Sequence, residues 1–333
     1  MLHVTVILIL AIGFAIIFDY INGFHDAANA IATVVSTRVL SPRNAIVMAA
    51  IFNFLGALYS TNVAKTVASG LVNPHESTQP VILAAIIGAI VWNLITWYFG
   101  IPSSSSHALM GGIVGAAVAR AGFKIVIWHG LTEKVIIPLF TSPLAGFFGG
   151  FLLMKLLYAI FANYTPAKVN KWFRRLQLIS SLFMAFSHGS NDAQKSMGVI
   201  TLALVSYGIL RTPVIPLWVI LVCAAAMALG TTAGGWRIIK TMGHRIVRLE
   251  PVHGFAAEVT SATVLLATAH FGMPVSTTHV ISSSILGVGS AKRLSAVRWG
   301  IARQMVIAWL LTLPAAGGVA ALTYIVFNAF GLK

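Results

Sequence analysis

Charged residues are scarce in this chain, and acidic residues above all. Only 9% of its 333 residues are charged and seven are acidic, whereas 58% are hydrophobic. About a quarter of the residues of a soluble globular domain are charged, so this composition excludes that class. Apolar stretches of membrane-spanning length recur, and at about 20 residues per crossing they predict roughly eight to ten spans. We therefore expect an all-α, polytopic integral membrane protein in contact with a lipid bilayer.

Other sequence signatures are also missing. The single cysteine, Cys223, excludes an intramolecular disulfide and a metal site built from cysteines. No P-loop or Rossmann glycine fingerprint is present, so the sequence indicates neither ATP-driven pumping nor a bound cofactor. The amino-terminal run has neither the basic region nor the cleavage site of a signal peptide, and we expect it to begin the first span.

Basic residues are numerous, and the formal net charge is +15. Such a balance can indicate a nucleic-acid partner. Here, however, fourteen of the 22 Lys and Arg residues fall in predicted loops on one side of the spans, as the positive-inside rule requires of a membrane protein. The pattern predicts that both termini lie outside and that no nucleic acid is bound.

A polar, glycine-containing stretch with an aspartate occurs twice. Asp26 lies in the first copy, residues 19–29, and Asp192 lies in register with it in the second, residues 187–195. A carboxylate within an apolar helix is costly and is usually retained for function. We expect both stretches to interrupt their helices and to face each other at the middle of the membrane. The alternative is a buried ion pair, for which Lys195 is the obvious partner.

A hydroxyl-rich motif also occurs twice, as Gly-x-Pro-x-Ser followed by two Ser or Thr residues and a His. It lies at residues 100–107 and 272–279, and a helix of small residues follows each copy. The chain therefore divides into a first repeat, 1–162, a basic linker, 163–175, and a second repeat, 176–333. The charge pattern predicts that the first repeat begins on the outer side of the membrane and the second on the inner side. The repeats are therefore predicted to be inverted. Inverted repeats with discontinuous helices are the architecture of secondary transporters.

The hydroxyl clusters are candidate anion ligands. A helix start offers unpaired N–H groups and the positive end of the helix dipole, which together with hydroxyl donors suit a tetrahedral oxyanion. Ordinary N-capping of the helix is the alternative. The predicted phosphate-binding residues are Ser103, Ser104, Ser105, Ser106, Ser276, Thr277, Thr278, Asn191 and Gln194.

The aspartates then need a cation, because bare carboxylates repel a polyanion. A proton shared with the carboxylate, or a Na⁺ ion held by carboxylate and amide oxygens, would remove the conflict. Anion binding that depends on a cation is symport. Glu258 is either a cation-coupling residue or the ion-pair partner of a nearby basic side chain. The predicted cation-coupling residues are Asp26, Asp192, Asn22, Asn29 and Glu258, of which Asp26 and Asp192 would be metal ligands only for Na⁺.

Other functions use similar residues. Ser, His and Asp can form a nucleophilic triad, but the serines and histidines here come in duplicated sets, which fits a symmetric binding site better, so we expect no enzymatic activity. A sulfate symporter would use the same donors, and an uncoupled anion channel would need no coupling cation. Phosphate is favoured over sulfate because HPO₄²⁻ can donate a hydrogen bond to a carboxylate.

At these motifs the sequence resembles the PiT family of inorganic phosphate transporters, nearly from end to end. The family signature Gly-x-(His/Asn)-Asp-x-x-Asn is matched by residues 23–29, and its second copy by residues 188–192. The resemblance implies cation-coupled phosphate symport, two inverted halves and commonly a homodimer. We therefore predict uptake of inorganic phosphate, free or as a neutral metal–phosphate complex, across a cell membrane.

Two positions bear on the coupling ion. Asn53 stands where sodium-coupled animal members of the family have a glutamate, and the bacterial low-affinity branch resembles this chain there. Glu258, by contrast, matches an acid of the sodium-coupled members. The resemblance favours H⁺ over Na⁺ and the cytoplasmic membrane of a bacterium.

Overall fold

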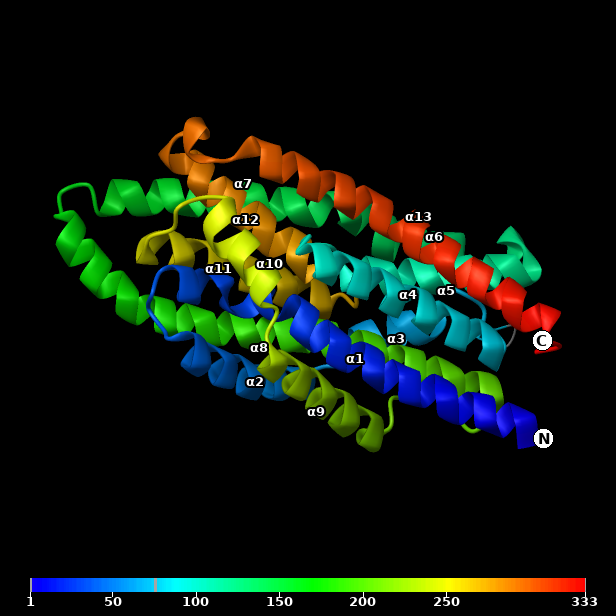
Figure 1. Ribbon diagram of the computed structural model, residues 1–333. Helices are drawn as coiled ribbons and strands as arrows, with labels where there is room; N and C mark the ends of the chain where they lie inside the picture. Colours follow the sequence, from blue (N-terminus) through cyan, green and yellow to red (C-terminus); the bar gives the residue numbers. More distant parts are fainter. Residues whose placement is uncertain (1, 75–76, 333) are drawn as a thin grey trace.

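The computed structural model describes residues 2–74 and 77–332, and within these ranges it is helical without a β-strand (Figure 1). The prediction of an all-α membrane architecture is therefore confirmed. The long elements in chain order are α1 (Leu2–Ser36), α2 (Pro42–Ala57), α3 (Asn62–Ser69), α4 (Gln79–Phe99), α5 (Ser105–Ala121), α7 (Ile137–Ile160), α8 (Pro166–Tyr207), α9 (Leu217–Ala233), α11 (Pro251–His270), α12 (Thr277–Lys292) and α13 (Trp299–Ala329). Short elements between them are η1 (Phe123–Ile125), α6 (Trp128–Leu131), η2 (Thr132–Ile136), α10 (Trp236–Lys240), η3 (Thr241–Arg245) and η4 (Leu294–Ala296).

Fewer helices can cross a membrane than the apolar stretches predicted. By length and composition, five described helices can span, or up to seven if the bent pairs that begin with α2 and α9 count as one span each. The sequence count included the stretch that forms α5, but α5 has only 17 residues and α12 only 16, and neither is among the helices that can span. Both short helices begin inside the protein, at the hydroxyl-rich motifs.

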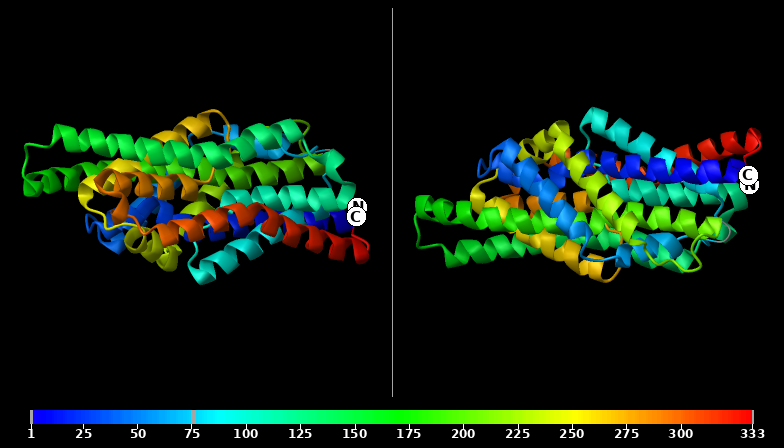
Figure 2. Two further views of the ribbon diagram at one scale, coloured as in Figure 1. Left: turned by 90° about the horizontal axis from the view of Figure 1, so that it is seen from above. Right: turned by 90° about the horizontal axis from the view of Figure 1, so that it is seen from below.

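The two repeats contain the same succession of elements in opposite directions. α1 runs away from the end of the molecule that holds both termini, whereas its counterpart α8 runs toward that end (Figures 1 and 2). α2 and α3 are bent by 68° at their junction, and their counterparts α9 and α10–η3 by 62°. The basic segment predicted as a linker is mostly helical, because α8 already begins at Pro166.

A helical hairpin in each repeat brings a hydroxyl-rich motif to the centre. In the first repeat the chain turns between α4 and α5, and in the second between α11 and α12. Gly100 and Gly272 make these turns with φ of 65° each, a conformation that favours glycine. The tips of the two hairpins therefore approach each other from opposite ends of the molecule.

Each hairpin is covered by the last helix of the other repeat. α13 packs along α5, and α7 packs along α12. Glycines allow these contacts: a Cβ added at Gly115 would lie 2.2 Å from the carbonyl oxygen of Gly317, and one at Gly287 would lie 2.0 Å from that of Phe147. The halves are thus interlocked rather than laid side by side.

A polar layer separates two apolar cores. The first core includes the amino-terminal half of α1 up to Phe18 and the carboxy-terminal half of α8. The second includes α1 from Ala28 onward and the amino-terminal half of α8. The polar residues of α1 and α8 lie between them, where the hairpin tips meet.

The predicted interruption of the helices at the two aspartate stretches is wrong. α1 is continuous through residues 19–29, and α8 is continuous through residues 187–195. The glycines serve close packing instead: a Cβ at Gly23 would lie 2.5 Å from the carbonyl oxygen of Met227, and one at Gly189 would lie 2.1 Å from that of Asn53. The discontinuous helices of this fold are the hairpin tips and the two bent pairs.

Candidate functional site

Asp26 of α1 is joined to both hairpin tips. Its Oδ2 accepts a hydrogen bond of 2.5 Å from Ser105, and its Oδ1 accepts one of 3.4 Å from Thr278. Nδ1 of His25 lies 2.8 Å from the same Oδ1. The carboxyl group is buried, so one acid of the first repeat connects a serine of its own hairpin with a threonine of the other.

Asp192 of α8 occupies the equivalent place in the second repeat. Its Oδ2 accepts a hydrogen bond of 3.0 Å from Thr277 and lies 3.2 Å from Nε2 of His188. Ligand atoms of Asp26, His188 and Asp192 all lie within 4.8 Å of one another. The structure therefore brings the two aspartates together in one buried site, at the starts of α5 and α12.

Lys195 has a larger part in this site than the sequence indicated. Its ammonium group contacts Asp192, and donates hydrogen bonds to Ser106 at 2.5 Å and to the carbonyl oxygen of Val275 at 3.1 Å. The sequence offered a buried ion pair of Lys195 with an aspartate only as an alternative, and the spacing of three residues on one helix allows it with Asp192. The contacts with both hairpin tips arise from tertiary packing, which no local pattern reveals.

Among the residues that the structure describes, Asn29 and Asn191 keep unpaired hydrogen-bonding atoms. Asn29 donates to Thr277 and Thr278 at 3.0 and 2.9 Å, while its Oδ1 has no partner among the described residues. Asn191 is buried, and neither its Oδ1 nor its Nδ2 makes a hydrogen bond within the described chain. Buried polar groups are nearly always paired, so these atoms are available to a ligand.

Gln194 makes its hydrogen bonds away from the aspartates, whereas Asn22 lies one helical turn before Asp26 on α1 and has a buried Oδ1 that is unpaired within the described residues. Oε1 of Gln194 accepts hydrogen bonds from the backbone N–H groups of Val63 and Ala64, at 2.9 and 3.3 Å. It thereby caps the start of α3. Nδ2 of Asn22 lies 4.0 Å from the sulfur of Met227 on α9.

Three of the predicted hydroxyl ligands stabilise the hairpin tips. Ser104 and Ser276 accept hydrogen bonds from the backbone N–H three residues later, at 3.1 and 3.2 Å, and so cap α5 and α12. Ser103 donates to Thr96 of α4 at 2.8 Å. N-capping therefore accounts for part of each motif, and Ser105, Ser106, Thr277 and Thr278 are the hydroxyls that face the aspartates and Lys195.

The hydrogen bonds of Asn53 fix the orientation of His188. Nδ2 of Asn53 donates to Thr231 at 2.9 Å, and its Oδ1 lies 3.1 Å from Nδ1 of His188. Because an amide oxygen only accepts, Nδ1 must carry the hydrogen of this pair. The other ring nitrogen, Nε2, then faces Asp192.

Comparisons with known proteins identify the family of the chain. A family model described as the Phosphate transporter family matches residues 22–168 and 161–320. The chain belongs to the phosphate transporter family. A "Probable low-affinity inorganic phosphate transporter" of Bacillus subtilis (strain 168) is 49% identical over 332 residues and 98% of both chains. One of the same name in Rhizobium meliloti (strain 1021) is 50% identical over 315 residues and 94% of both chains.

A solved structure is similar to this phosphate transporter family member over nearly its whole length. It is titled "The sodium-dependent phosphate transporter", and it matches with a TM-score of 0.87 at 26% identity over 97% of this chain and 99% of that one. The relatives are named as transporters, which agrees with the prediction that the chain is not an enzyme.

A second polar cluster of the transporter surrounds Glu258 on α11. The buried carboxylate accepts hydrogen bonds from Thr33 at 2.6 Å, from Gln177 at 3.0 Å and from Ser180. Its hydrogen-bond partners in the described chain are all neutral, so the alternative of an ion pair is not what the structure shows. Thr33 lies seven residues beyond Asp26 on α1, about 10 Å along the helix.

A basic cavity of about 990 Å³ opens next to the Glu258 cluster. Thr37 lines the cavity and donates a hydrogen bond of 2.9 Å to Oε1 of Gln177, which in turn contacts Glu258. The cavity contains one acid, Glu250. Its cationic side chains are Arg38, Arg248, Lys292, Arg293 and Arg298, and His244 and His253 also line it. These side chains give this end of the molecule a positive potential that attracts anions.

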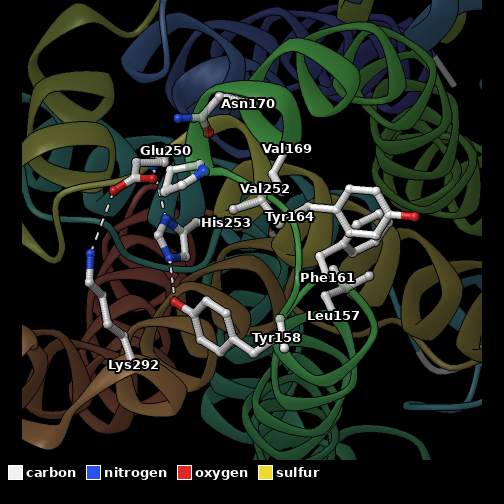
Figure 3. A pocket seen from close by; sticks show the side chains of 12 residues that line it. Leu157, Tyr158, Phe161, Tyr164, Val169, Asn170, Glu250, Val252, His253 and Lys292 are labelled. Carbon is white, nitrogen blue, oxygen red and sulfur yellow. Dashed lines mark hydrogen bonds and ion pairs between the residues drawn. The ribbon is translucent and has the colours of Figure 1, made fainter.

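A smaller pocket of about 280 Å³ adjoins the basic cavity (Figure 3). Figure 3 shows a chain of interactions across it from α7 to α12. Tyr158 lies 2.9 Å from Nε2 of His253, Nδ1 of His253 accepts from the backbone N–H of Glu250 at 3.1 Å, and Glu250 lies 3.5 Å from Lys292. These interactions join the ends of α7, α11 and α12 at the rim of the cavity.

Proposed function

We propose that this family member is a secondary active symporter that takes up inorganic phosphate together with a proton. One observation carries the proposal. Two buried aspartates accept hydrogen bonds from hydroxyl groups at two converging helix starts, so an anion site and a cation site share the same atoms.

Phosphate would bind between the starts of α5 and α12. The hydroxyls of Ser105, Ser106, Thr277 and Thr278 already point into this region, because they bond to Asp26, Asp192 or Lys195. The unpaired donor of Asn191 and the ammonium of Lys195 supply further N–H groups. Lys is a common phosphate ligand, and helix starts favour anions.

The orientation of His188 supports the proton as coupling ion. Since its Nδ1 donates to Asn53, its Nε2 and the Asp192 carboxylate would be two acceptors 3.2 Å apart. A proton between them turns this repulsion into a charge-assisted hydrogen bond. With Lys195 charged as well, this proton makes the site electrically neutral before phosphate enters.

Sodium is the second candidate, favoured by a different observation. Carboxylate oxygens of Asp26 and Asp192 lie close together, and the unpaired Oδ1 of Asn29 adds an oxygen ligand. Na⁺ prefers oxygen ligands, as do other hard cations. The solved structure of similar fold is titled as sodium-dependent. The same oxygens could accept the metal of a neutral metal–phosphate complex.

Counterflow uptake of labelled phosphate in proteoliposomes tests the proposal, with pH and sodium gradients imposed separately. We expect accumulation under a pH gradient alone. Accumulation only under a sodium gradient would assign the site to Na⁺, and uptake that ignores both gradients would indicate an anion channel. Requirement for a divalent metal in the same assay would identify the complex as the substrate.

Sulfate competition tests the substrate. We expect excess sulfate to leave phosphate uptake nearly unchanged, since a carboxylate of the site can accept a hydrogen bond from HPO₄²⁻ only. Strong transport of labelled sulfate without phosphate transport would contradict the proposal.

We further propose that both termini face outward and that two copies associate in the membrane. Both termini lie at one end of the molecule, opposite the connection between α7 and α8 (Figure 1). Labelling of single cysteines placed near the termini, in a Cys223→Ala background, would report the orientation. Crosslinking in membranes would report the homodimer.

A further inference from the structure

Besides Asp26, α1 contains one other acid, Asp19, and the proposed phosphate site does not use it. Asp19 is completely buried, and neither carboxylate oxygen has a hydrogen-bond partner within the described residues. The sequence allowed it to cap a helix, but α1 continues for many residues on both sides. A carboxylate this far from water, without a hydrogen bond, is strongly disfavoured as an ion.

The polar neighbours of Asp19 come from two other helices. They are the hydroxyl of Ser196 on α8 and the thiol of Cys223 on α9. The hydroxyl of Ser196 is itself buried without a partner in the described part of the chain. The charged groups that face Asp19 are Asp192 and Lys195 of α8. α4 and α9, which also pack on α1, contain no charged residue.

Lys195 does not neutralise Asp19. An ammonium group has three donors, and those of Lys195 serve Asp192, Ser106 and Val275. Asp192 adds a second negative charge nearby. A cation must therefore accompany Asp19 whenever this part of the protein is closed to water.

The surroundings of Asp19 select the kind of cation. A sodium ion needs several oxygen ligands, whereas the polar side chains beside Asp19 are one hydroxyl and one thiol, a soft group that suits it poorly. A proton needs only the carboxyl group itself. We propose that Asp19 is a second proton-binding site of the transporter, separate from the cation held at Asp26 and Asp192.

The position of Asp19 on α1 gives the proton a route. Asp19, Asn22, Asp26, Asn29 and Thr33 follow each other at spacings of three or four residues, so they form one face of the helix. α1 starts at the end of the molecule that holds the termini (Figure 1), and Asp19 precedes Asp26 along it. Thr33, by contrast, follows Asp26 and bonds to Glu258, whose partner Gln177 contacts Thr37 of the basic cavity. The central aspartates therefore have one buried acid on each side, and Asp19 is placed to load or release a proton at the end that holds the termini.

Infrared spectroscopy tests the proton directly, because protonated carboxyl groups absorb apart from carboxylates and amides. We expect a protonated-carboxyl band in the purified transporter at neutral pH that Asp19→Asn removes and the matched control Ser196→Ala shifts without removing. A spectrum in which Asp19→Asn changes only carboxylate bands would overturn the proposal. This readout does not depend on which substrate is carried.

Transport assays test the use of the proton, and this step rests on the proposed symport of phosphate. Asn mimics the protonated acid, so Asp19→Asn should lower accumulation driven by a pH gradient about tenfold or more, while phosphate exchange without a gradient falls less than about twofold. Asp19→Glu, which can still bind a proton, should recover part of the accumulation. Unchanged accumulation in Asp19→Asn, or equal loss of accumulation and exchange in a correctly folded variant, would overturn the role. Failure of the wild-type protein to carry phosphate would instead contradict the proposed function and leave the infrared result intact.

Discussion

In the first repeat Asp26 is followed three residues later by Asn29, whereas in the second repeat Asp192 is followed three residues later by Lys195. Asn29 reaches the threonines at the tip of α12, and Lys195 reaches Ser106 at the tip of α5. The two repeats have nearly the same arrangement of helices, but they differ in charge at the residue three positions after the aspartate. Symmetry creates two equivalent helix starts at one polar centre, and the difference between Asn and Lys leaves only one of the two aspartates with a lysine partner.

The largest effect is expected from neutralising either aspartate. Asp26→Asn and Asp192→Asn should each lower gradient-driven phosphate accumulation by about a hundredfold or more, because the coupling cation loses a carboxylate that binds it. Labelled phosphate uptake in proteoliposomes would measure this, with membrane insertion checked for each variant. Normal accumulation by both variants would remove the aspartates from the mechanism.

Stability should separate the two aspartates even if transport does not. Asp192→Asn leaves the buried ammonium of Lys195 without its carboxylate, which should lower the free energy of unfolding by about 3–5 kcal/mol. Asp26→Asn leaves no such charge behind and should cost clearly less. Thermal unfolding in detergent would compare them, and the double change Asp192→Asn with Lys195→Gln should recover much of the loss. Equal destabilisation by the two single changes would mean that the charge difference between the repeats does not affect the free energy of unfolding.

Lys195→Asn would make the second repeat match the first at this position. The phosphate would lose its fixed positive partner, so we expect the KM for phosphate to rise about tenfold. The matched change Asn29→Lys tests the opposite direction by adding a second ammonium group. If Lys195→Asn leaves KM unchanged, Lys195 is only the buried ion-pair partner of Asp192.

The smallest effect is expected at Gln194, which occupies the motif but caps α3. Gln194→Ala should lower the free energy of unfolding by about 1 kcal/mol and leave the KM for phosphate unchanged. Gln194→Glu keeps an acceptor for the two N–H groups of α3 and serves as the control for the cap. A large rise in KM with unchanged stability would restore the ligand role that the sequence predicted.

The sequence predicted the class of fold and the meeting of the motifs because both depend on repeated patterns. The doubled Asp and hydroxyl motifs and the charge pattern together required an inverted pair, and an inverted pair brings equivalent elements to one centre. The continuity of α1 and α8 was not predictable. In the sequence, Gly23 and Gly189 are equally compatible with a helix break and with the close approach of another backbone. Only the positions of Met227 and Asn53 in the structure show that close approach is the reason.

Individual roles within the site depended on contacts that are distant in sequence. Gln194 meets the start of α3, more than a hundred residues away, and this contact turns a motif residue into a cap. Lys195 meets Ser106 through the approach of the two tips. Residue type and spacing identified which side chains belong to the polar layer, and packing decided which of them face a ligand.

The exchange of covering helices between the repeats has a consequence for biosynthesis. α5 is made with the first repeat, yet α13, which packs along it, follows all the other described helices of the second repeat. The first serine-bearing tip therefore remains incompletely enclosed in the membrane until the second repeat has been made. Truncation before α13 should leave a protein that inserts but is rapidly degraded, and supplying the missing helix as a separate peptide should rescue it.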